Sequence, residues 1–201
     1  MHIEISDKPL SWGALDLSLF GVDTDWFGKP VKPPVAFGFA VDLNYLWFVA
    51  SHAKSPNLHP DARPGDFQAE LWKYDVAEFF LSDPSTGRYL EFNLAPNGAW
   101  WSAEFTAPRI RAEIADTPFP EVATFADMGE DGAWLAAAAI PLDQLRKRLN
   151  FGPESQLNAS FILNSPEQQF LSATQLGSGE PDFHLPDKFP KLNFFHNPKE
   201  A

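Results

Sequence analysis

The sequence predicts an all-β protein: an antiparallel β-sandwich of the jelly-roll-like kind with one short helix. Many short runs of β-branched and aromatic residues alternate with turn clusters of Gly, Pro, Asn and Asp, and only one segment keeps helical spacing. This combination is typical of a sandwich and not of an α/β fold. Because the chain has 201 residues and 44% of them are hydrophobic, we expect residues 1–201 to form a single domain with a buried core.

The expected strands begin with a hairpin. Val35–Val41 and Tyr45–Ala50 are rich in apolar and aromatic residues, and Asp42-Leu43-Asn44 joins them as a turn. Later runs of the same kind are separated by further turn residues. They predict strands at Asp75–Ser82, Arg88–Leu94, Ala99–Phe105, Arg109–Ala115, Trp134–Ile140, Leu157–Asn164 and Phe170–Thr174.

The helix is expected directly after the strand that ends at Ile140. Pro141 starts it, and Leu142, Leu145 and Leu149 keep helical spacing up to Asn150. Basic residues in its last turn suit the negative end of the helix dipole. The Pro-dense pieces Lys29–Pro34 and Ser55–Pro64 are expected to be loops.

The charge and composition exclude several classes of protein. The formal net charge is −12, which argues against nucleic acid and against an anionic membrane surface as partners. The absence of Cys excludes a disulfide scaffold and a Cys-ligated zinc site. The first residues lack a basic segment followed by an apolar one. We therefore expect a cytoplasmic protein by default, and an extracytoplasmic one if a leader has been removed.

Asp75 to Phe105 is expected to form three consecutive antiparallel strands with one apolar face. A first loop centred between Pro84 and Ser85 would place Glu78 opposite Glu91, Phe80 opposite Tyr89 and Val76 opposite Asn93. The alternate positions are all apolar and predict the core face: Ala77, Phe79, Leu81, Leu90, Phe92 and Leu94.

The second turn decides which of two neighbouring tryptophans faces the core. A two-residue loop at Pro96-Asn97 would place Trp101 in the core and Trp100 on the outer face, and a three-residue turn would exchange them. With the two-residue loop, the outer face collects Glu78, Tyr89, Glu91, Asn93, Trp100, Ser102 and Glu104, and Trp72 shares the parity of Glu78.

This outer face is a candidate surface for a polyhydroxylated ligand. Aromatic rings stack on the C–H faces of a sugar, while carboxylates and amides bind its hydroxyls. The alternative is structural: one face of an antiparallel sheet is commonly wet, and the long loop Ala50–Leu71 could fold over the exposed tryptophan and bury it.

A family resemblance rests on four stretches in order. Leu71-Trp72-Lys73-Tyr74-Asp75-Val76-Ala77-Glu78-Phe79-Phe80-Leu81 resembles the W-x-x-D-x-v-E-x-f-l signature of family 9 carbohydrate-binding modules and DOMON-like domains. The other three are Tyr89–Phe92 with Pro96–Gly98, Trp134–Leu145, and Phe183–Phe189 with Leu192–Phe194. The resemblance spans the chain from Leu43 to Phe194.

The resemblance implies a β-sandwich that binds the ends of sugar chains without catalysis, with two aromatic side chains on either side of a terminal sugar. The aromatic positions map onto Trp72 and Phe183, and the signature carboxylate maps onto Glu78. Glu91 stands where the family has an Arg, and Ser160 or Ile162 stands in the region of a late Gln. His184 either hydrogen-bonds within the closing loop or contacts a ligand beside Phe183. The predicted ligand-binding residues are Trp72, Glu78, Glu91, Asn93, Phe183 and His184.

Two other functions are kept as alternatives. Directly opposed Glu78 and Glu91 would lie about 5 Å apart at Cβ, which suits the paired acids of a retaining glycosidase. A structural or protein-interaction DOMON-like domain would keep the fold without the pocket, and then Trp72 should be fully buried under the Ala50–Leu71 loop.

No cofactor is expected for saccharide binding. The five histidines include no i,i+4 pair and no H-E-x-x-H pattern, so a catalytic metal is not expected. Haem is not expected either, because Met128 lies in an acidic turn. A structural calcium ion is left open at acidic turn residues, namely Asp23, Asp25, Asp127, Glu130 and Asp131. The sequence does not indicate a protein partner or a catalytic domain.

Overall fold

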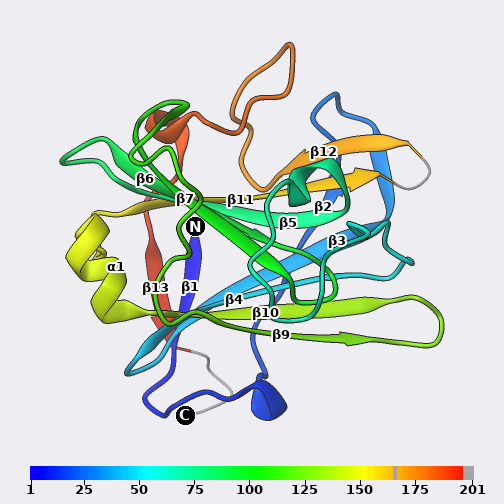
Figure 1. Cartoon of the computed structure of the whole chain (residues 1–201), viewed down its shortest axis with the longest axis horizontal. Helices are drawn as coiled ribbons and strands as arrows, with labels where there is room; N and C mark the ends of the chain where they lie inside the picture. The colour runs from blue at the N-terminus through cyan, green and yellow to red at the C-terminus, as the bar shows by residue number, and fades with distance from the viewer. Residues whose placement is uncertain (165–166, 197–201) are drawn as a thin grey trace.

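The computed structural model describes residues 1–164 and 167–196, in which two β-sheets pack face to face (Figure 1). The first sheet has the strand order β13-β1-β3-β4-β10-β9, with β2 also paired to β3. The bounds are β1 His2–Ile5, β2 Phe20–Thr24, β3 Pro30–Val41, β4 Tyr45–His52, β9 Ala123–Met128, β10 Trp134–Pro141 and β13 Asn193–His196.

The second sheet carries the candidate site and has the order β12-β11-β5-β6-β7-β8. Its strands pair antiparallel throughout, whereas in the first sheet β1 runs parallel to both β13 and β3. The bounds are β5 Val76–Asp83, β6 Arg88–Leu94, β7 Trp100–Ala107, β8 Ile110–Arg111, β11 Gln156–Asn164 and β12 Gln168–Ser172. The predicted all-β sandwich is confirmed.

The core between the sheets is built by the alternation that the sequence predicted. The inward positions of β5 and β6 are all fully buried: Ala77, Phe79, Leu81, Leu90, Phe92 and Leu94. At its centre, the Phe79 ring lies 5.2 Å from Phe48 and 5.1 Å from Phe92, centroid to centroid. Such ring pairs add to the free energy gained by burying apolar surface.

The helix α1, Leu142–Leu149, closes one end of the sandwich (Figure 1). Its three predicted leucines face the core, which confirms the spacing argument. Asn150 ends the helix with φ 49°, and its side-chain amide donates a hydrogen bond to Asp83 at 2.7 Å. Among the described residues, no helix has the length and apolarity needed to cross a membrane.

Several boundaries differ from the prediction. β3 begins at Pro30, so the Pro-dense piece expected as a loop is part of a strand that β2 flanks. The strands β1, β2, β9 and β13 were not predicted, because they are short and lack a long run of β-branched residues. The strand expected at Arg109–Ala115 is wrong beyond residues 110–111. The chain turns sharply before it, since Arg109 adopts a left-handed φ of 61°.

Candidate functional site

The hairpin of β5 and β6 positions both glutamates, but in a register shifted by two residues from the prediction. Asp83 pairs with Arg88 because the loop has four residues, 84–87, and ends in Gly87 at φ 72°. Glu78 therefore faces Asn93, so the expected direct opposition of Glu78 and Glu91 is wrong. Both glutamates still share the predicted face, because a shift of two preserves the alternation of side chains.

The turn between β6 and β7 exchanges the two tryptophans. Ala95 and Ala99 are hydrogen-bonded to each other, which leaves a three-residue turn with Gly98 at φ 84°. Trp100 consequently packs in the core, where its ring stacks on Phe92, and Trp101 lies on the site face. The placement of Trp100 and Ser102 on the outer face is thus wrong, and the three-residue alternative holds.

A row of polar side chains crosses the second sheet. Ser160, Glu78, Asn93 and Trp101 are register partners on four neighbouring strands. The Ser160 hydroxyl donates a hydrogen bond to Glu78 Oε2 at 3.2 Å, and the Asn93 amide donates one to Glu91 Oε1 at 3.3 Å. Within the described residues, Asn93 Oδ1 and Trp101 Nε1 are buried without a hydrogen-bond partner.

This face is covered, although a wet face was one expectation. A 3₁₀ turn before β5, Leu71–Lys73, and the segment after β12 pack on it and form a second apolar cluster that includes Leu71, Leu176, Phe183 and Phe189. The covering leaves an open cavity of about 430 Å³, here called the site pocket. It is lined by Trp72, Glu78, Phe80, Glu91, Trp101, Phe105, Arg109, Arg111, Ile162, Phe170, Pro181, Phe183 and His184.

The site pocket brings together most of the residues predicted from the sequence. Trp72, Glu78, Glu91, Phe183 and His184 all line it, whereas Asn93 is fully buried and reaches the site through its hydrogen bond to Glu91. Trp72 is half-buried, and its ring packs edge-on against Trp101 at a centroid distance of 5.0 Å.

Burial controls the charge of the two glutamates. It raises the pKa of Glu78 well above its usual value, and the neighbouring Glu91 carboxyl raises this pKa further, while the Ser160 hydroxyl lowers it. Burial also raises the pKa of Glu91 to about 7, against the lowering effect of the Asn93 amide and of two arginines. Both carboxyls therefore hold a proton to a higher pH than an exposed glutamate does, and Glu91 titrates near neutral pH.

His184 connects the closing loop to the carboxyl pair. The Tyr89 hydroxyl oxygen accepts the backbone N–H of Arg109 at 3.0 Å and lies 2.8 Å from His184 Nδ1. Burial lowers the pKa of His184 to about 4, so the ring is neutral at neutral pH and shares one hydrogen bond with the Tyr89 hydroxyl. Its other ring nitrogen, Nε2, lies 3.7 Å from Glu91 Oε2. His184 thus contacts both the loop and the pocket.

The sequence reasoning missed two arginines at the pocket opening, Arg109 and Arg111. Arg109 donates a hydrogen bond to Asp182 at 2.8 Å, and Arg111 donates one to Asp116 at 2.6 Å. The Arg111 guanidinium also lies 5.4 Å from the centre of the Trp101 ring. Both were assigned to a continuous strand, although Pro108 directly before Arg109 was a signal for the turn that aims them at the pocket.

Comparisons with known proteins bear on the fold. No family model matches the chain. The human protein UPF0462 protein C4orf33 is 25% identical over 190 residues, which cover 87% of this chain and 87% of that protein. A solved structure of a candidate carbohydrate-binding protein from Bacteroides uniformis aligns with a TM-score of 0.73 at 18% identity, over 97% of this chain and 98% of the other.

Two further solved structures belong to a family 9 carbohydrate-binding module from Caldicellulosiruptor kristjanssonii. Its complex with glucose aligns with a TM-score of 0.63 at 12% identity, over 98% of this chain and 96% of the other. Its complex with cellotriose aligns with a TM-score of 0.62 at 11% identity, over 100% of this chain and 97% of the other. The chain shares the fold of carbohydrate-binding modules. At these identities the likeness concerns the fold alone.

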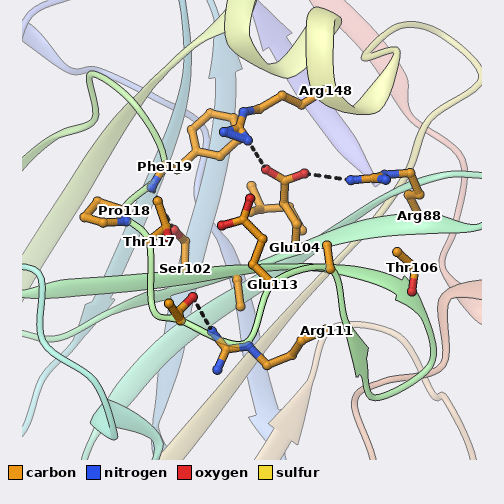
Figure 2. A pocket seen from close by; sticks show the side chains of 14 residues that line it. Arg88, Ser102, Glu104, Thr106, Arg111, Glu113, Thr117, Pro118, Phe119 and Arg148 are labelled. Atoms are coloured by element: carbon orange, nitrogen blue, oxygen red, sulfur yellow. Dashed lines mark hydrogen bonds and ion pairs between the residues drawn. The ribbon is translucent and has the colours of Figure 1, made fainter.

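A second cavity, of about 310 Å³, lies on the opposite side of β7 (Figure 2). In it, Glu104 accepts hydrogen bonds from Arg148 at 2.6 Å and from Arg88 at 3.1 Å, and Figure 2 shows its carboxylate between the two guanidinium groups. The Arg148 guanidinium also lies 5.4 Å from the centre of the Phe119 ring. These contacts tie α1 to the second sheet, which the placement of Glu104 on the outer face did not foresee.

Two of the acidic residues considered for calcium accept hydrogen bonds from the backbone of their own turns. Asp25 Oδ1 accepts the backbone N–H groups of Phe27 and Lys29, and Asp131 Oδ1 accepts that of Ala133. In residues 1–164 and 167–196, no group of three or more His, Cys, Asp or Glu side chains gathers in a way that could hold a metal ion.

Proposed function

We propose that the site pocket binds a small saccharide or another small polyhydroxylated ligand without catalysing a reaction. The observation that supports this is the combination of six aromatic rings and two buried carboxyls in one open cavity: Trp72, Phe80, Trp101, Phe105, Phe170 and Phe183, with Glu78 and Glu91. Rings of this kind stack on sugar C–H faces, and the carboxyls exchange hydrogen bonds with hydroxyls. The volume of about 430 Å³ suits a small ligand.

The fold comparison agrees with this proposal, since the module that shares the fold is known in complex with glucose and with cellotriose. In the site pocket, Trp72 and Phe183 would contact the ring faces of the sugar, and Glu78 and Glu91 would bind its hydroxyls. The net charge of −12 supports a neutral ligand or one with positive charge over a nucleic acid or an anionic membrane.

The glycosidase and the structural alternative each predicted a specific geometry that the structure does not have. The retaining-glycosidase alternative rested on direct opposition of the two carboxyls, but Glu78 and Glu91 lie diagonally in the hairpin, a relation that separates two residues by about 7–8 Å and their Cβ atoms by somewhat less. The structural alternative needed a fully buried Trp72, but this side chain is half-buried and lines the cavity.

The test is a titration with a panel of mono- and oligosaccharides, with and without calcium, followed first by tryptophan fluorescence and then by calorimetry. We expect saturable binding by the wild type and loss of binding in Trp72→Ala. Trp12→Ala is the matched control, because Trp12 is a half-buried tryptophan that stacks on Phe125 of the other sheet. Circular dichroism verifies the fold of each variant.

The proposal fails if a correctly folded wild type binds no member of the panel. It fails equally if Trp72→Ala binds as tightly as Trp12→Ala does. A dependence of binding on calcium would place an ion near the pocket and reopen the assignment of the acidic turns.

A further inference from the structure

Two buried carboxyls, Glu78 and Glu91, line the site pocket, and neither forms an ion pair with a Lys or Arg side chain of the described residues. Glu78 is 2% exposed and Glu91 is 7% exposed. Within the described part of the chain, no Lys or Arg nitrogen lies within 4.0 Å of either carboxylate, and the one ring nitrogen at that range is His184 Nε2, 3.7 Å from Glu91. Buried carboxylates without a counter-charge are unfavourable, so at least one of them holds a proton unless a bound cation compensates the charge.

The two arginines of the pocket, Arg109 and Arg111, form ion pairs with residues other than Glu78 and Glu91. The Arg109 side chain is 61% exposed and pairs with Asp182, and Arg111 pairs with Asp116 while it stacks on Trp101. Their charges are thus compensated at the opening by two aspartates. Both arginines lower the pKa of Glu91 through their charge, but neither forms an ion pair with Glu78 or Glu91.

The rest of the pocket wall also favours a cation. Six aromatic rings line the cavity, and their faces attract positive charge, most strongly where water is excluded. An ammonium group offers three hydrogen-bond donors and no acceptor. It therefore complements carboxylate oxygens, which only accept, better than a hydroxyl does.

Resting on the proposed saccharide binding, we infer that the site pocket selects an amino sugar, that is, a small saccharide that carries a protonated amine. The ammonium group binds between the Glu78 and Glu91 carboxylates and displaces their proton, and the sugar ring contacts Trp72 and Phe183. A neutral sugar binds in the same pocket but leaves the carboxyls without a counter-charge.

The experiment compares matched ligands by calorimetry at neutral pH: glucose with glucosamine, and galactose with galactosamine. N-acetylglucosamine keeps the substituted position but removes the charge, and ethylammonium keeps the charge but removes the sugar. We expect at least one amino sugar to bind about tenfold to a hundredfold more tightly than its neutral counterpart, the range for a hydrogen bond to a charged group. The acetylated sugar should show no gain.

Two isosteric variants test the carboxyls. Glu78→Gln and Glu91→Gln keep the shape of the side chain but remove its charge and replace one acceptor oxygen by an NH2 donor. Each should therefore abolish the preference for the amino sugar, measured as the ratio of its affinity to that of the neutral sugar in the same variant. Glu113→Gln is the matched control, because Glu113 is exposed and lines the other cavity.

The outcomes separate this inference from the proposed function. Equal affinity for the neutral and the amino sugar overturns the inference and leaves saccharide binding intact. A preference that persists in both Gln variants, or ethylammonium binding as tightly as glucosamine, also overturns it. If no sugar of either kind binds, both the inference and the proposed function fail.

Discussion

Replacing Glu91 by Gln is expected to stabilise the folded protein above neutral pH. Burial raises the pKa of Glu91 from 4.5 to about 7, so the folded state holds a proton that the unfolded state releases at lower pH. The contribution of Glu91 to the free energy of unfolding is therefore fully present below pH 4.5 and is lost as the pH rises through about 7. The two pKa values differ by about 2.5, which at about 1.4 kcal/mol for each pH unit is worth about 3 kcal/mol.

His184 has the opposite effect in part of the same range. Burial lowers its pKa from 6.5 to about 4, so the unfolded state binds the proton more tightly, and stability from this group is lost as the pH falls from 6.5 to 4. The two effects oppose each other in the wild type. The difference between Glu91→Gln and the wild type isolates the carboxyl, because both proteins contain His184.

The measurement is urea denaturation, followed by circular dichroism at pH 5.5 and pH 8, both above the sequence pI of about 4.7. The stabilisation by Glu91→Gln should rise from about 1 kcal/mol at pH 5.5 to about 3 kcal/mol at pH 8. Glu78→Gln should change the free energy of unfolding in the same direction. The exposed Glu113→Gln should leave the free energy of unfolding unchanged at both pH values. An equal effect of Glu91→Gln at both pH values would refute the burial argument.

Three further changes test the fold by the same denaturation assay. Phe79→Ala removes a fully buried ring from the centre of the core and should cost about 3–5 kcal/mol, so a loss below about 1 kcal/mol would contradict the packing described. Gly87→Ala should cost about 1 kcal/mol through its φ of 72°, whereas Gly13→Ala, at a glycine without positive φ, should cost less. Glu104→Gln should cost about 1–2 kcal/mol through its two arginine pairs, and a loss that does not shrink in high salt would count against that origin.

The faces of the central strands could be predicted because they depend on alternation alone. Every inward residue of β5 and β6 follows from the period of two, and so does the shared face of Glu78 and Glu91. The helix likewise follows from the spacing of its leucines. The family resemblance added Phe183 and His184, which lie too far from Trp72 and Glu78 in the sequence for a local pattern to connect them.

The register and the exchange of Trp100 for Trp101 could not be predicted, because each depends on the length of one turn. Turns of two, three or four residues have compatible sequences here, and the hydrogen bonds that choose among them form only when the strands pair. The arginines of the pocket depend on another local choice, the left-handed conformation of Arg109.

By itself the sequence determined the sandwich class, the core face of the site sheet and the shared face of Glu78 and Glu91, because these follow from alternation, spacing and composition. Only the tertiary structure decided that the site face is covered. Tyr89 and His184, 95 positions apart, meet there, and the segment after β12 excludes water from the carboxyls. Solvation depends on every group packed around a side chain, so the raised pKa values of Glu78 and Glu91 arise from folding and not from their sequence neighbours.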